Sequence, residues 1–408
     1  MAVPQVGAKN YAVGVGSSGA EGKTLALIQA TGRDVTQFID YVELSKGLTP
    51  LTYLLMKLGQ TKKVRNSSFI HLEYDANPMS VQVNGPLDAE VTSTTLVLDT
   101  PQGNYIKAYD ILYNPLTEEQ MYVSAVASPT SCTITRGHGS SDPAAIADNS
   151  VLLIMSPTIP GGGRSQYALY TEPTLVRNYV QIARESVSLE RRAMEAEAYG
   201  PDDWPRAKKA AADRLSYKME LSVLLNALNA TTPVTTGGID HWVSSNVVNA
   251  GGVLTEQTFN NWLRDIFSYN QDNPSKVLLI FGDFILGYLD AWGRDRLTQS
   301  PNDTATGIAI AEYKSSLVPG GKVKFIRHGM LSKAMDPNTA NPMAGLAFAV
   351  NMDHLKLAFY GNSGQVNFRD NIQENDEDCR KGEWFADWGV YMSAERRFGK
   401  LYGVTELT

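Results

Sequence analysis

The sequence predicts an α+β fold in which helices and strands mix without a repeated unit. Three observations lead to this class. Residues 80–157 hold short β-prone runs separated by turns, residues 171–230 pass from an extended segment into one long helix, and the last third alternates helices with strands. The absence of a repeated strand–helix–strand order argues against a doubly wound sheet. At 408 residues the chain can hold two or three domains.

The N-terminal region predicts an arm, a short helix and a strand. Residues 1–23 are rich in Gly, Ser and Ala, which is typical of an arm and not of a core element. Residues 67–77 alternate, with Phe69 on one face and Ile70 on the other, as in a half-exposed strand. Before it, and after an interruption at Pro50, apolar residues recur at helical spacing: Leu51, Leu54, Leu55 and Leu58.

Residues 80–157 predict a small β-barrel or sandwich. The β-prone runs are divided by turn clusters such as Asn84-Gly85-Pro86, and Pro157 with the following Pro160 and glycines ends the unit. Short strands at this spacing favour an all-β module. The predicted strands are 95–98, 110–113, 121–126, 132–135 and 151–155.

The middle of the chain predicts an extended segment followed by a long helix. Residues 176–189 are extended and two-faced. Asp203 is a good N-cap, and Pro205 is tolerated in the first turn, where no intrahelical donor is needed. The pattern ends near Asn229, which gives a helix roughly 35 to 40 Å long. Its apolar positions recur every three or four residues: Trp204, Ala207, Ala211, Leu215 and Met219.

The last third predicts helices and strands in mixed order. Thr255 can cap an amphipathic helix that contains Phe259 and Trp262. The remaining predicted elements are a strand at 276–281, a helix at 283–292, a polar loop at 298–307, strands at 323–328, 346–350 and 355–360, and an alternating run at 384–396.

Charge and composition narrow the function classes. The net charge of −7 excludes a whole-protein basic field for grasping nucleic acid. The two cysteines are far apart in sequence and form no metal-binding motif. So few cysteines in a chain of this length are typical of a protein of the reducing cytosol. No apolar run reaches the ~18 residues of a membrane span, and the N-terminus lacks signal-peptide features. We therefore expect a chain made in cytoplasm.

Candidate catalytic and cofactor motifs fail on their context. Gly14, Gly16 and Gly19 spell GxGxxG, but no strand precedes them, so a loose arm is favoured. Gly22-Lys23-Thr24 lacks the first glycine of a phosphate-binding loop, since Ser17 stands at that position. The five His make no zinc motif, and no GxSxG elbow occurs. The acidic residues 374–378 read as a solvated turn. We expect no catalytic residue, cofactor or metal.

The order of these parts resembles the major capsid proteins of tailed bacteriophages, closest to the Pseudomonas phage SU-ten-like branch. The resemblance spans about residues 30 to 405. Four groups of residues carry it. The first is Asn178-Tyr179-Val180-Gln181-Ile182 followed by Val187-Ser188-Leu189, and the second is Tyr199-Gly200 ahead of the long helix, which contains Glu220 and Leu224-Leu225-Asn226. The third is Gly238-Ile239 leading to Thr255-Glu256, and the fourth is Met352-Asp353-His354-Leu355-Lys356-Leu357 together with the run 384–401.

The resemblance implies a Hong Kong 97-like capsid fold with a small all-β domain inserted in the extended loop. Residues 1–65 would be an N-terminal arm that reaches along neighbouring subunits. Residues 66–79 and 171–190 would be the strands of the extended loop, and 80–157 the inserted domain. Residues 191–239 with 376–408 would form the peripheral domain around the long helix, and 240–375 the axial domain.

The expected function is that of a major capsid protein, not an enzyme. The chain would assemble as hexamers and pentamers into the icosahedral head around double-stranded DNA, in the host cytoplasm. Expected partners are other copies of the chain and scaffolding, portal and decoration proteins, without a membrane. The alternatives are another virion part, such as a decoration or tail protein, and a nucleotide-binding enzyme. The expected interface residues are Val180, Gln181, Ile182, Trp204, Leu215, Met219, Pro301, Asn302, Asp303 and Thr304.

Overall fold

The computed structural model divides the chain into two units. One comprises Met1–His71 with Val176–Thr408, and the other comprises Leu72–Leu175. We call them the main unit and the inserted unit, and each is described by itself. The described residues are 50–74, 78–163, 166–167, 172–195, 203–272, 274–292, 297–299, 311–314, 322–331, 342–361 and 365–407.

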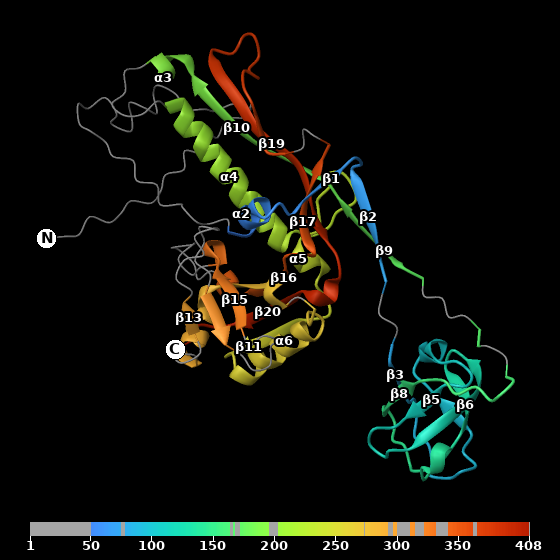
Figure 1. The fold of residues 1–408 in the computed structure, drawn as a ribbon. Coiled ribbons are helices and arrows are strands. Elements are labelled where there is room, and N and C mark those ends of the chain that lie inside the picture. Colours follow the sequence, from blue (N-terminus) through green and yellow to red (C-terminus); the bar gives the residue numbers. More distant parts are fainter. Residues whose placement is uncertain are drawn as a thin grey trace. The chain divides into compact units, whose positions relative to one another are not determined.

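The main unit contains two mixed sheets (Figure 1). The five-stranded sheet has the order β1-β17-β19-β10, with β18 also paired to β19, and the seven-stranded sheet has the order β11-β20-β16-β12-β15-β14-β13. The first sheet is built from β1 (Thr61–Val64), β17 (Leu355–Tyr360), β19 (Cys379–Met392), β10 (Gln181–Glu190) and β18 (Asn367–Arg369). The second is built from β11 (Val247–Gly252), β20 (Gly399–Val404), β16 (Ala347–Asn351), β12 (Val277–Phe281), β15 (Lys322–Arg327), β14 (Ala311–Lys314) and β13 (Leu297–Gln299).

Helices of very different length accompany these sheets. The longest is α4, with 23 residues. The others described are α2 (Pro50–Lys57), α3 (Arg191–Glu195), α5 (Ile239–Trp242), α6 (Glu256–Ser268) and α7 (Asp283–Trp292), beside α4 (Asp203–Leu225). Short 3-10 turns lie at Gln102–Tyr105, His138–Ser140, Pro274–Lys276, Gly329–Leu331, Pro342–Gly345 and Glu395–Arg397.

The strand β12 separates two hydrophobic cores. All five of its residues are buried. Because side chains alternate along a strand, Leu278 and Ile280 join a core with α2, α4 and the five-stranded sheet, whereas Val277, Leu279 and Phe281 join a core with α6 and α7. A strand buried on both faces reads as a continuous apolar run, which the sequence VLLIF shows.

The inserted unit has its own core under a six-stranded sheet of order β3-β8-β5-β6-β7-β4. Its strands are antiparallel neighbours, and buried aliphatic side chains such as Leu96, Leu112 and Ile134 fill the space beneath them. The strands are β3 (Ser80–Gln82), β4 (Thr95–Val97), β5 (Ile111–Tyr113), β6 (Gln120–Ser128), β7 (Ser131–Thr135) and β8 (Val151–Met155).

Among the described strands, β2 (Ser68–Glu73) and β9 (Thr174–Tyr179) pair with each other and with no third strand. We call this pair the ribbon. In the sequence the ribbon strands flank the inserted unit, because the chain runs from β2 into Leu72–Leu175 and returns through β9.

Most predicted elements are confirmed within a few residues. Thr255 caps α6, with its Oγ1 accepting from the N–H of Thr258 at 3.2 Å. The helix predicted at 283–292 and the strand predicted at 355–360 have those bounds. Pro50, expected to interrupt the helix before Leu51, instead begins α2, as the fixed φ and missing donor of proline allow at a first helical position. The predicted polar loop at 298–307 is partly strand, since β13 includes Leu297–Gln299, and the rest lies outside the described residues.

The segment 176–189, expected to be one extended segment, is divided between two sheets. It breaks at Val180, so that β9 belongs to the ribbon while β10 pairs with β19 in the five-stranded sheet. Only the part before Val180 therefore lies in the ribbon. The long helix is also shorter than expected, since α4 ends at Leu225 and not near Asn229.

Candidate assembly surfaces

Asn178 and the predicted interface residue Gln181 both make side-chain hydrogen bonds within the main unit. The Asn178 amide donates to the carbonyls of Gly237 at 3.0 Å and Val390 at 2.7 Å, and its Oδ1 accepts from the Gly237 N–H at 2.9 Å. The Gln181 Oε1 accepts from the Asn226 amide at 2.9 Å. The Asn226 amide also donates to the Thr236 carbonyl at 2.8 Å, so the residue after α4 is tied to β10 and to the segment before α5.

The predicted interface residues near Val180 have different surroundings. Val180 is buried in a small cluster with Val64 and Phe69, and its N–H donates to the Ser67 carbonyl at 2.8 Å. Ile182 is 67% exposed. Because side chains alternate along β10, Ile182 points away from the face that carries Gln181. Ile182 is thus the member of this segment whose side chain is open to a neighbour.

The predicted helix residues lie inside the subunit. Leu215 and Met219 are buried in the core beside the five-stranded sheet, and Trp204 is buried in a cluster with Val187 and Leu189. Their burial leaves little side-chain surface for another copy. Pro301, Asn302, Asp303 and Thr304 lie outside the described residues.

A groove between β10 and α4 brings several predicted residues together. Its volume is about 260 Å³. The Trp388 indole of β19 lines it, is fully buried, and finds no acceptor for its Nε1–H among the described residues. Sequence reasoning missed Trp388, because no local pattern shows an unmatched donor. The lining residues are Gln181, Ile182, Ala183, Arg184, Leu215, Lys218, Met219, Ser222 and Trp388.

The rim of this groove carries excess positive charge. The Glu185 carboxylate accepts from Lys218 Nζ at 2.5 Å and from Arg214 Nε at 2.8 Å, so two cations share one acid. Burial raises the pKa of Glu185, but the hydrogen bonds and charges of Lys218 and Arg214 outweigh it and hold the pKa below its ordinary value. Glu185 therefore stays ionised and leaves one positive charge uncompensated.

A buried carboxylate on the opposite side of α4 holds the start of α2. Glu220 Oε1 accepts from the Leu51 N–H at 2.8 Å, and Oε2 accepts from the Thr52 N–H at 2.7 Å. His328 Nε2 lies 2.8 Å from Oε1, and both side chains are fully buried. The first N–H groups of a helix have no intrahelical acceptor and favour a negative charge. Glu220 supplies acceptors for two of these N–H groups. We call this arrangement the Glu220 clamp.

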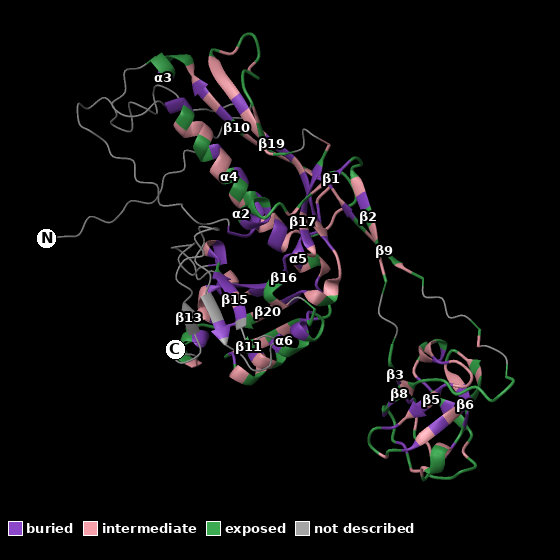
Figure 2. Ribbon diagram, viewed as in Figure 1, coloured by how far each residue is buried: buried purple, intermediate pink, exposed green. Residues whose placement is uncertain are grey.

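The ribbon carries an uncovered apolar face. Ile70, Leu72 and the following Tyr74 alternate along β2 and are 52%, 56% and 67% exposed. On β9, Leu175 is half exposed. Along β2, exposed positions alternate with less exposed ones (Figure 2). A two-stranded ribbon is marginal in water without a covering surface, and apolar side chains in a row are typical of an interaction site.

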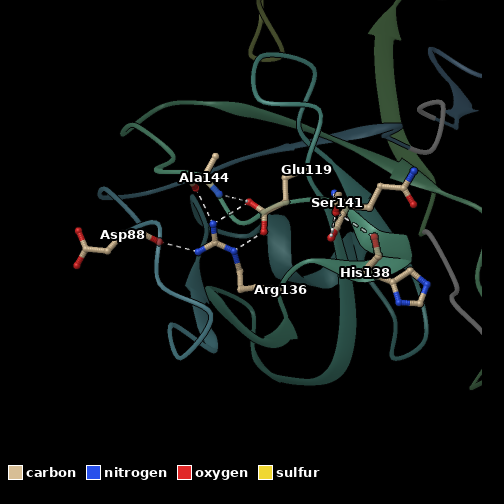
Figure 3. A network of polar contacts seen from close by, with 7 residues as sticks. Asp88, Glu119, Arg136, His138, Ser141 and Ala144 are labelled. Carbon is tan, nitrogen blue, oxygen red and sulfur yellow. Dashed lines mark hydrogen bonds and ion pairs between the residues drawn. The ribbon is translucent and has the colours of Figure 1, made fainter.

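The inserted unit is braced by a buried ion pair (Figure 3). Arg136 donates through Nε and Nη2 to the Glu119 carboxylate at 2.5 and 2.7 Å, and its remaining donors reach the carbonyls of Asp88 and Ala144. The Ala144 N–H completes the set by donating to Glu119 at 3.2 Å. Each of the three guanidinium nitrogens thus has an acceptor, so the pair has a structural explanation and needs no ligand. On the outside of the same unit, Val151, Leu153 and Met155 of β8 form an exposed apolar row.

The described residues contain no cluster suited to a metal ion. No group of three or more His, Cys, Asp or Glu side chains within them converges on one point. This includes the acidic turn at 374–378, whose members Glu377 and Asp378 lie at the surface. The buried Cys132 is unreactive, because burial raises the pKa of its thiol to about 12. Within the described part of the chain, no helix is both long and apolar enough to cross a membrane.

The sequence matches one known protein family over most of its length. The family model described as SU10 major capsid protein matches residues 20–405. The chain belongs to this family of major capsid proteins. It is therefore a component of the icosahedral head shell of a tailed phage and not a decoration or tail protein. Family membership accords with the predicted Hong Kong 97-like fold class.

Solved capsid structures are similar to this major capsid protein at low sequence identity. The cyanophage A-1(L) capsid asymmetric unit is 12% identical, with 91% of this chain and 97% of that chain covered and a TM-score of 0.46. Mycobacterium phage Cain is 9% identical, with coverages of 95% and 100% and a TM-score of 0.42. The satellite phage P4 procapsid with its size determination (Sid) protein is 9% identical, with coverages of 94% and 98% and a TM-score of 0.38. No curated protein matches the sequence.

Proposed function

We propose that this capsid protein assembles through the ribbon, whose apolar face packs on a neighbouring copy in pentamers and hexamers around double-stranded DNA. The observation that carries the proposal is the row Ile70, Leu72 and Tyr74, apolar side chains that are each more than half exposed. Burying such a row on association is favourable at roughly 25 cal/mol per Å² of apolar area. Closed symmetry then repeats the contact around each ring.

The proposed domain roles follow the same division of the chain. Residues 1–65 act as an arm, the ribbon is the extended loop, residues 80–157 are a module inserted in that loop, and residues 240–375 form the axial domain. We propose different roles for the predicted interface residues. Ile182 offers exposed surface, whereas the buried Trp204, Leu215 and Met219 act by supporting the subunit.

The proposed role is structural, without bond-making chemistry or a cofactor. Further partners are scaffolding and portal proteins, possible decoration proteins and the packaged DNA, with assembly in the host cytoplasm. The net charge of −7 supports a shell that does not grip the duplex. The exposed row Val151, Leu153 and Met155 on the inserted unit is a surface on which such a partner could bind.

Replacement of one ribbon side chain tests this proposal. Ile70→Asp places a charge on the apolar face, and we expect folded subunits that form no closed shells by negative-stain electron microscopy and light scattering. The matched control is Val253→Asp, at a main-unit position that is 68% exposed and lies outside the ribbon. That variant should form shells like the parent chain. Shells from Ile70→Asp at the parent yield would contradict the proposal.

A further inference from the structure

The β10–α4 groove has the features of a binding site for an acceptor group. Trp388 has one polar atom, a donor, and that donor is buried without an acceptor among the described residues. Buried polar groups in proteins almost always find a partner. The volume of about 260 Å³ is several times the roughly 30 Å³ that one water occupies in the liquid. The groove therefore has room for a large side chain with an oxygen that could accept a hydrogen bond from the Trp388 indole.

The charges around the groove favour an acidic occupant. Lys218 and Arg214 share the single carboxylate of Glu185. Two cations thus share one acid beside the groove, in a chain whose net charge is negative. An occupant with carboxylates would balance them.

The part of the chain that precedes α2 in sequence contains a segment of this chemistry. Residues 1–49 lie outside the described residues. Pro50 follows them, and next come Leu51 and Thr52, whose N–H groups donate to Glu220 on α4. Glu220 and the lining residues Lys218 and Ser222 occupy the same stretch of that helix. Within residues 1–49, residues 37–44 combine apolar side chains with two acids in the order Gln-Phe-Ile-Asp-Tyr-Val-Glu-Leu.

The length of the connection allows this segment to reach the groove. Tyr41 precedes Pro50 by nine positions, and an extended chain spans up to about 30 Å over that number of steps. The path around α4 is shorter, since a helix with its side chains is about 10–12 Å across.

We propose that residues 37–44 of the same chain bind in the β10–α4 groove. The Tyr41 ring lies against Leu215 and Met219, its phenolic oxygen accepts from Trp388 Nε1–H, and the carboxylate of Asp40 pairs with Lys218. The Glu220 clamp then fixes one end of the segment and the groove fixes the other. This proposal concerns the single subunit and does not depend on the ribbon's role in assembly.

Disulfide trapping in the full-length, unassembled chain at low concentration tests the proposal. In a Cys132→Ser, Cys379→Ser background, Val42→Cys is combined with Ser222→Cys at the groove. We expect an intrachain crosslink, identified by mass spectrometry, to form at least about tenfold faster than in the matched control Thr31→Cys with Ser222→Cys, because docking raises the effective concentration of the thiols. Equal rates in the two variants would overturn the proposal, as would a crosslink formed only between chains.

A charge exchange provides the second measurement. Lys218→Glu in the trapping variant should slow the crosslink at least about tenfold, since like charges then face each other. Adding Asp40→Lys should restore the rate, which a misfolded variant would not show. Circular dichroism checks that each variant folds. Failure of the double exchange to restore the rate would overturn the assignment of Asp40 to Lys218.

Discussion

Glu220 is the residue on which the start of α2 depends. Glu220→Gln keeps the shape but replaces one accepting oxygen by an NH₂ group, so Leu51 or Thr52 loses its acceptor. We expect a loss of about 2 to 3 kcal/mol in the free energy of unfolding and faster hydrogen exchange at both amides. Urea unfolding and exchange measured by mass spectrometry check this. The control is Asp265→Asn at an exposed position of α6. Unchanged exchange at Leu51 and Thr52 would contradict the clamp.

Single residues were predicted well where their role is local and poorly where it is distant. Thr255 caps the next turn, so its role is visible in a few letters of sequence. The partners of Glu220 lie 108 and 169 positions away, and no spacing rule connects them. The same holds for Asn178, whose amide bonds reach Gly237 and Val390. Resemblance to the capsid family pointed to Asn178 and Glu220 without showing what they contact.

The helix α6 allows a test at the level of one element. Its cap Thr255 accepts from Thr258 N–H, and its buried face includes Phe259 and Trp262. Thr255→Ala should lower the free energy of unfolding by about 1 kcal/mol, because the Thr258 N–H loses its acceptor. Thr255→Ser keeps a hydroxyl and should stay close to the parent in the same urea titration. A serine variant as unstable as the alanine variant would show that the methyl group matters instead of the cap.

Elements with strong periodicity were predicted almost to the residue, and edge elements were not. The helix α7 and the strand β17 match their expected bounds because apolar spacing marks them clearly. The short strands β1, β11 and β18 were missed. They carry few buried residues, and pairing with a distant strand, not their own pattern, makes them extended. The break at Val180 has the same origin, since the flanking strands have different partners.

At the scale of the whole chain, the separate cores predict separate unfolding. Leu112 is fully buried in the inserted unit and Leu279 in the main unit. Each Leu→Ala replacement should cost about 2 to 5 kcal/mol in its own unit, because it leaves a cavity. We expect two transitions in a calorimetric scan of the unassembled chain, with Leu112→Ala lowering one of them and Leu279→Ala the other. A single transition that moves with both variants would contradict independent cores.

The pairing of β2 with β9 has a consequence for protein engineering. The two strands that flank the inserted unit in sequence are hydrogen-bonded neighbours, so the polypeptide departs from the ribbon and rejoins it at nearly the same place. Any foreign domain whose own termini lie close together could be spliced between these strands without stretching the host backbone. The insertion point is thus a natural position for grafting enzymes or antigens onto a particle, one per subunit.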